Sequence, residues 1–160
     1  MSTMIEAFIV EDITEELSAS QQALAHTLER MNEEQPWLLA YIFSEEFEVF
    51  TDSEREVLLF LTSVIWKTVF QVWGEQEQVN ATQLAAAEER NWATLQTTKA
   101  SNFRDRLTPF FAEHPEEEEL LALVEDTIVD DVDSPVSAEG REALFITLKS
   151  MIDCLVLPNL

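Results

Sequence analysis

The sequence has very little glycine and proline, and this scarcity limits the folds available to it. Only two of its 160 residues are Gly and five are Pro. Tight β-hairpin turns favour Gly or Asn-Gly, because their central residues adopt positive φ angles. A chain so poor in Gly cannot build many hairpins, so we expect helices joined by short polar loops.

Cysteine is equally scarce, and no apolar run is long enough for a bilayer. The single cysteine, Cys154, excludes an intramolecular disulfide framework. No basic segment followed by an apolar run opens the chain, so we expect no signal peptide. The most apolar stretch, 57–73, is interrupted by Thr, Ser, Lys and Gln and falls short of the roughly 20 apolar residues that a span requires. These absences predict a cytoplasmic protein without a membrane segment.

Positive charge is the third deficit. Nine basic residues stand against 32 acidic ones, which gives a formal net charge of −23. Such a charge repels nucleic-acid backbones and anionic membrane surfaces. The nearest thing to a basic patch is Arg104 with Arg106. We therefore expect no direct binding to nucleic acid and none to membranes.

Apolar residues are plentiful. They make up 46% of the chain and include ten Phe and four Trp, which argues against an acidic disordered segment. A chain of this length fits one domain and can bury roughly two-thirds of its unfolded surface. We therefore predict a single all-helical domain over residues 1–160.

Helical spacing of apolar residues predicts six to seven helices in a compact bundle. Thr51 and Glu54 have the spacing of a capping box, and Gly74 is a natural helix stop. The helix between them, about 52–73, is apolar around most of its circumference and should be mostly buried at the centre. Helical spacing also occurs in the segments 5–17, 18–34, 36–50, 82–99, 102–111, 115–129 and the one that ends before Pro158. Residues 7–10 could instead be extended, and Pro109 should bend or restart the segment 102–111.

The central helix carries an aromatic stripe and one lysine. Trp66, Phe70 and Trp73 share a face, which is typical of core packing but could also line a ligand pocket. We predict that Trp66 and Trp73 are largely buried. If Lys67 were buried, its pKa would fall and it could act as a nucleophile or base. A partly exposed Lys67 with a solvated ammonium is the simpler interpretation, because Lys is seldom fully buried.

The acidic run at 116–119 also allows two interpretations. Glu116, Glu117, Glu118 and Glu119 could form an acidic interaction face. Four carboxylates in the first turn of a helix also complement the helix dipole, and this structural role is the simpler explanation.

The loop after residue 130 partly matches a calcium-binding pattern. Asp131, Asp133, Glu139 and Glu142 occupy the first, third, ninth and twelfth positions of an EF-hand loop. Pro135 replaces an oxygen ligand, and Val136 stands where Gly allows the turn, so the simpler interpretation is a capped helix start. We predict no cofactor, apart from the calcium ion that this partial pattern could bind.

Other catalytic patterns are weak. His26 and His114 each have Glu three residues later, but His26 should face solvent and His114 precedes Pro115 at a helix start. Asp153 beside Cys154 should raise the thiol pKa and keep it unreactive. Two glycines cannot supply a phosphate-binding loop or a nucleophile elbow.

Three functional hypotheses follow. The favoured one is a non-enzymatic interaction module whose acidic surface binds a basic protein or peptide. The alternative is a small-ligand-binding protein or enzyme with a site inside the bundle that uses Lys67, Trp66 and Trp73. A calcium-responsive helix-loop-helix at 131–142 is a minor alternative. One of the apolar helices could also mediate homodimerisation.

Overall fold

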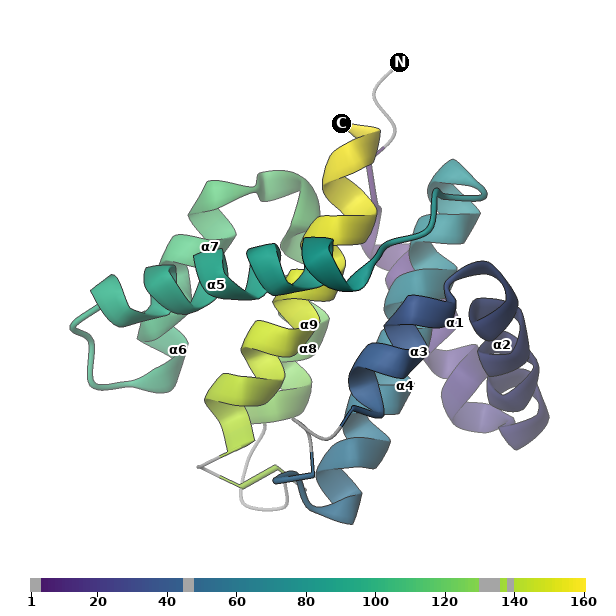
Figure 1. The fold of residues 1–160 in the computed structure, drawn as a ribbon, viewed down its shortest axis with the longest axis horizontal. Coiled ribbons are helices and arrows are strands. Elements are labelled where there is room, and N and C mark those ends of the chain that lie inside the picture. The colour runs from purple at the N-terminus through teal and green to yellow at the C-terminus, as the bar shows by residue number, and fades with distance from the viewer. Residues whose placement is uncertain (1–3, 45–47, 130–135, 138–139) are drawn as a thin grey trace.

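The fold is all-α, as predicted. The computed structural model describes residues 4–44, 48–129, 136–137 and 140–160, and within them the chain is helical without a strand (Figure 1). The helices are α1 (Ala7–Ala19), α2 (Gln21–Glu34), α3 (Pro36–Ile42), α4 (Asp52–Trp73), α5 (Ala81–Thr97), α6 (Phe103–Arg106), α7 (Thr108–Glu113), α8 (Glu118–Val129) and α9 (Gly140–Val156). Short 3₁₀ helices cover Pro115–Glu117 (η2) and Leu157–Asn159 (η3).

Helix α4 begins and ends where local signals place it. The Thr51 hydroxyl accepts a hydrogen bond from the Glu54 amide, and the Glu54 carboxylate accepts one from the Thr51 amide, so the predicted capping box is present. Gly74 follows the last turn with φ of 81°, a conformation that favours Gly over residues with a Cβ. These signals work because they need only residues within one turn of the helix end.

Other boundaries differ from the predicted ones. Ser18 lies inside α1 and donates to the Thr14 carbonyl, while Ser20 caps α2. Asn80, rather than Thr82, forms the capping box of α5, together with Gln83. Each error arises because several hydroxyl or amide residues stand within one turn of the helix start, and any of them can cap.

Two predicted helices are shorter or broken. Helix α3 ends at Ile42 instead of continuing to residue 50, although Phe50 is buried as its spacing suggested. The predicted 102–111 helix is restarted at Pro109, as expected: it is two short helices, with Pro109 in the first turn of α7. Pro lacks an N–H and crowds the preceding turn, so it starts a helix more readily than it continues one.

Two helices form the centre of the bundle. Helix α4 contacts α1, α2 and α9, and α9 also contacts α5 and α8. Figure 1 shows α5 crossing α9, with α8 behind it. Every residue from Leu144 to Asp153 is buried, so α9 shares the central role predicted for α4. Ring contacts such as Phe110 with Phe145, 5.1 Å between centroids, fill the space between α7 and α9.

Helix α4 meets the length and composition of a membrane span, whereas its sequence led us to expect an apolar stretch too short for one. It has 22 residues, and half of its most apolar window is buried inside the fold. A core helix passes the same test, and the contacts of α4 with α1, α2 and α9 give its apolar faces protein partners.

Candidate functional site

A cleft between α1 and α8 is lined by carboxylates and by apolar side chains. The cleft has a volume of about 350 Å³. Its apolar lining residues are Ala7, Val10, Ala122 and Leu123, and Thr14 also lines it. Four carboxylates line it as well: Glu11 and Glu15 from α1, and Glu119 and Asp126 from α8. We call this set of residues the acidic groove.

The carboxylates of the acidic groove lack close cations. No Lys or Arg lines the cleft, and within the described part of the chain no cation forms an ion pair with Glu11, Glu15 or Glu119. Asp126 lies at the edge, where its oxygen is 3.7 Å from a guanidinium nitrogen of Arg104. The groove therefore keeps most of its negative charge for solvent or for a partner.

The acidic run 116–119 divides between two regions of the molecule. Glu119 lines the acidic groove and Glu118 is exposed. Glu117, by contrast, is fully buried, so the prediction that all four residues share one exposed face is wrong for Glu117. Its direction follows from the 3₁₀ turn at Pro115–Glu117, which places it against α9.

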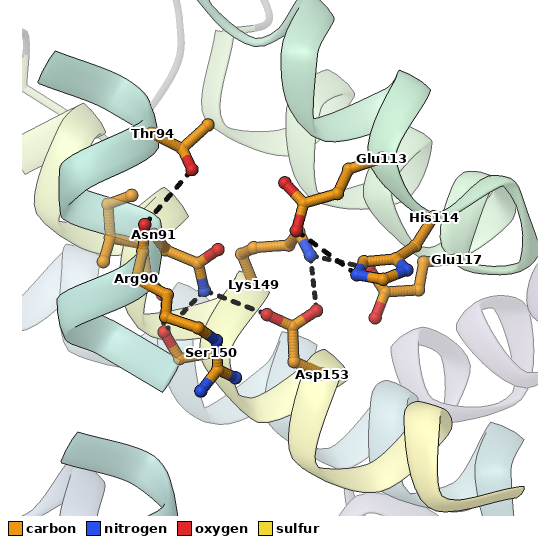
Figure 2. Close-up of polar contacts among 10 residues, drawn as sticks. Arg90, Asn91, Thr94, Glu113, His114, Glu117, Lys149, Ser150 and Asp153 are labelled. Atoms are coloured by element: carbon orange, nitrogen blue, oxygen red, sulfur yellow. Dashed lines mark hydrogen bonds and ion pairs between the residues drawn. The ribbon is translucent and has the colours of Figure 1, made fainter. Parts of the chain in front are cut away.

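Glu117 belongs to a buried charge cluster, shown in Figure 2. Its Oε1 accepts a hydrogen bond of 2.8 Å from the Lys149 ammonium, which also bonds Asp153 one turn later on α9. The Asn91 amide on α5 donates to Asp153 at 3.0 Å and to the Ser150 hydroxyl at 3.1 Å. We call Asn91, Glu117, Lys149, Ser150 and Asp153 the buried cluster, and it joins α5, η2 and α9.

The charges of the buried cluster balance if Glu117 holds a proton. Burial and the neighbouring Asp153 raise the pKa of Glu117 to about 9, against the opposing attraction of Lys149. Burial would lower the pKa of Lys149, but both carboxyl groups outweigh it and raise that pKa. Glu117 Oε2 is buried without a donor among the described residues, which suits a neutral carboxyl better than a carboxylate. One ammonium and one carboxylate then remain.

Sequence reasoning missed this cluster. Lys149 and Asp153 stand four residues apart inside a stretch of α9 that is apolar on its other faces, and this spacing was the available signal. The partners Glu117 and Asn91 lie 32 and 62 residues from the α9 residues that they bond, so no local pattern connects them.

Trp66 and Lys67 lie together at a second cleft, between α2 and α4. The Trp66 ring stacks on Phe70 with centroids 5.3 Å apart, and Trp66 is buried as predicted. The Lys67 ammonium bonds Glu16 at 2.7 Å and its side chain is 28% exposed, which matches the solvated interpretation. Trp73 is only partly buried and lines a different cleft beside Cys154 and Pro158. The three predicted ligand-binding residues therefore do not share one site.

The calcium hypothesis falls largely outside the described residues, which exclude Asp131 and Asp133. Glu142 is described, and its carboxylate pairs with Arg106. In the part of the chain that the structure covers, no three His, Cys, Asp or Glu side chains gather in a group suited to a metal ion. His26 is exposed on α2, and His114 contacts Glu113 at 3.3 Å after the end of α7.

Cys154 has the unreactive environment that its neighbour suggested. Burial is the largest cause and Asp153 adds to it, and together they raise the pKa of the thiol to about 11. A thiol that stays protonated at neutral pH is a poor nucleophile.

Comparison with models of protein families, with curated proteins and with solved structures finds no significant match to this chain. Function must therefore be argued from the clefts and charges themselves.

Proposed function

We propose that this protein is a non-enzymatic interaction module that binds a basic, partly apolar segment of another protein in the acidic groove. The observation that carries the proposal is the lining of that groove, which combines four carboxylates with four apolar side chains and, among the described residues, includes no Lys or Arg. A segment with Lys or Arg flanking an apolar side chain complements both features.

The charge of the groove has a cost in the free protein. Glu11 and Glu15 are both exposed and stand one turn apart on α1, where like charges destabilise a helix by about 0.2–0.5 kcal/mol. A basic partner would relieve this repulsion. These charges are present although their repulsion lowers the stability of the helix, so a role in binding explains them better than a role in folding.

An exposed aromatic residue extends the surface. Phe8 is 56% exposed on α1 and stands one turn before Glu11. An aromatic side chain exposed beside carboxylates offers apolar contact and a ring face for a partner's Arg or Lys. The partner that fits is therefore cationic and amphipathic rather than uniformly charged.

The proposal is tested by calorimetric titration with a synthetic amphipathic helix of Leu, Ala and Lys. We expect binding at low salt that weakens steeply as salt rises, since exposed charges are screened within about 10 Å at 0.1 M. A peptide with Glu in place of Lys should not bind. Failure of the Lys peptide to bind at low salt would contradict the proposal.

A pair of charge-matched variants locates the site. Glu11→Gln/Glu15→Gln/Glu119→Gln removes three charges from the groove. Glu33→Gln/Glu75→Gln/Glu89→Gln removes three from exposed positions elsewhere. We expect the groove variant alone to lose most of the affinity. Equal weakening by both variants would mean that net charge, and not the groove, attracts the peptide.

The natural partner can then be sought by pull-down from a cell lysate at low and high salt, with the groove variant as the reference. A basic protein that the unmodified chain retains at low salt, and that the groove variant loses, is the expected result.

A further inference from the structure

The second cleft, between α2 and α4, has the opposite character to the acidic groove. It has a volume of about 340 Å³, and the charged side chains that line it are the cations Arg30 and Lys67, together with His26. No carboxylate of the described residues lines it, in a chain with 32 acidic and nine basic residues. Two of the nine basic residues of the chain therefore line one cleft, which suits this cleft to an anionic group.

One wall of the cleft is aromatic. Trp66 and Phe70 stack on each other, and the Arg30 guanidinium lies over both rings, 4.7 Å from the Phe70 centroid and 5.9 Å from the Trp66 centroid. This cation–π contact places the guanidinium beside the rings. A planar ligand could therefore meet the guanidinium and the ring edges together.

The cations of the cleft already pair with carboxylates. Lys67 bonds Glu16 at 2.7 Å, and Arg30 lies 3.9 Å from Glu34. The Glu16 side chain is 50% exposed, and exposed ion pairs are worth only about 0–1 kcal/mol. An incoming carboxylate can therefore replace or share such a contact at little cost.

We propose that the α2/α4 cleft binds a small aromatic carboxylate, with its ring against Trp66 and Phe70 and its carboxylate at Arg30 and Lys67. The cleft volume stands at the lower end of the roughly 300–1,000 Å³ typical of ligand sites, which favours a ligand of one or two rings. Arg and Lys supply hydrogen-bond donors and positive charge, so the polar group of the ligand must be an acceptor and an anion. This site is independent of the acidic groove and of the function proposed for it.

The test uses 2-naphthoate as the probe and 2-naphthalenemethanol as its uncharged counterpart. Both are titrated into ¹⁵N-labelled full-length protein, and amide chemical shifts are followed. We expect naphthoate to shift amides of 26–30 and 66–71 in a saturable way, and the alcohol to bind at least about tenfold more weakly, equivalent to one lost charged contact. No saturable shift in these segments, or equal binding of the alcohol, would overturn the proposal.

Two double variants distinguish a specific contact at the cleft from a general effect of net charge on binding. Arg30→Met/Lys67→Met should weaken naphthoate binding by about tenfold or more, whereas Arg90→Met/Lys99→Met, which removes two exposed cations elsewhere, should change it less than about twofold. Because Arg30 also packs on the aromatic wall, Lys67→Met alone serves as a second variant and should give a smaller loss with the fold intact. If both double variants weaken binding equally, no site-specific anion contact exists and the proposal is wrong.

Discussion

The acidic groove and the buried cluster each contain one glutamate of the run 116–119, and these two glutamates lie in opposite environments. Glu119 lies at the groove, where its carboxylate has no cation among the described residues. Glu117, two positions earlier, is buried against Lys149, and burial together with the neighbouring Asp153 raises its pKa to about 9. The difference lies in solvent: an exposed carboxylate can remain charged and unpaired, whereas a buried one must be paired or neutralised.

The comparison implies that the two regions contribute to different properties. Removing a partner from the buried cluster leaves an uncompensated polar group in the core and should change stability. Removing a carboxylate from the groove should change binding and leave stability nearly intact. Four substitutions test this division, in decreasing order of expected effect on the free energy of unfolding.

The largest effect is expected from Lys149→Met. It leaves Glu117 and Asp153 buried together without their shared ammonium, and breaking a buried pair costs about 3–5 kcal/mol. Urea unfolding followed by circular dichroism measures the loss. A loss below about 1 kcal/mol would mean that the cluster is not an energetically coupled unit.

Glu117→Gln should stabilise the protein at alkaline pH. A neutral Gln can accept from Lys149 as the protonated Glu does. Because the folded pKa of Glu117, about 9, exceeds the reference value of 4.5, its contribution to stability is complete below pH 4.5 and is lost as pH rises through 9. We therefore expect the free energy of unfolding of Glu117→Gln at pH 8 to exceed that of the unmodified protein by at least about 1 kcal/mol, the value of one pKa unit.

The pH dependence provides the control for this variant. The two proteins should have equal stability near pH 4, where Glu117 is protonated in both folded and unfolded chains. If Glu117→Gln were instead the less stable protein at pH 8, Glu117 would be ionised in the fold and the charge balance described for the buried cluster would be wrong.

Lys67→Met extends the comparison to a lysine that is partly exposed instead of buried. Lys67 pairs with one exposed carboxylate, Glu16, and keeps part of its side chain in solvent. Exposed pairs of this kind contribute about 0–1 kcal/mol. The same urea unfolding should therefore show a loss several times smaller than that of Lys149→Met, and equal losses would contradict the distinction between the two environments.

The smallest effect on stability is expected from Glu119→Gln, which should lie within about 0.5 kcal/mol of the unmodified protein. Glu118→Gln, at the neighbouring exposed position, is the matched control. Thermal unfolding of the three proteins in parallel measures the difference. A large loss for Glu119→Gln alone would assign that carboxylate to folding.

The sequence predicted the features that depend on neighbours along the chain. The all-α class, the capping box at Thr51 and Glu54 and the stop at Gly74 each follow from residues within a few positions of one another. The predicted start of α2 was wrong because Ser18 and Ser20 both have a hydroxyl that can cap a helix, and the structure uses Ser20. Tertiary contacts decide between such alternatives.

The sites were harder to predict for the same reason. Four consecutive Glu residues look alike in sequence, and the turn at η2 together with the position of Lys149 selects Glu117 for burial. Trp66 and Lys67 were identified as a candidate pair, but Arg30, which completes their cleft, comes from α2 and has no local signal that links it to α4. Trp73 was predicted to share a face with Trp66 and yet lines another cleft, with residues of the 75–79 segment and of the C-terminal end.

The solvent-accessible carboxylates of the acidic groove, and not the buried Glu117, are the groups that we propose bind a basic segment. The most direct test compares Glu119→Gln with Glu117→Gln in calorimetric titrations of the Leu-Ala-Lys peptide at low salt. Both variants convert one Glu of the same run to an amide. We predict that Glu119→Gln weakens binding by about two- to fivefold, the value of one exposed charge contact, while Glu117→Gln leaves it unchanged. Equal effects of the two substitutions, or no effect of Glu119→Gln, would contradict the account.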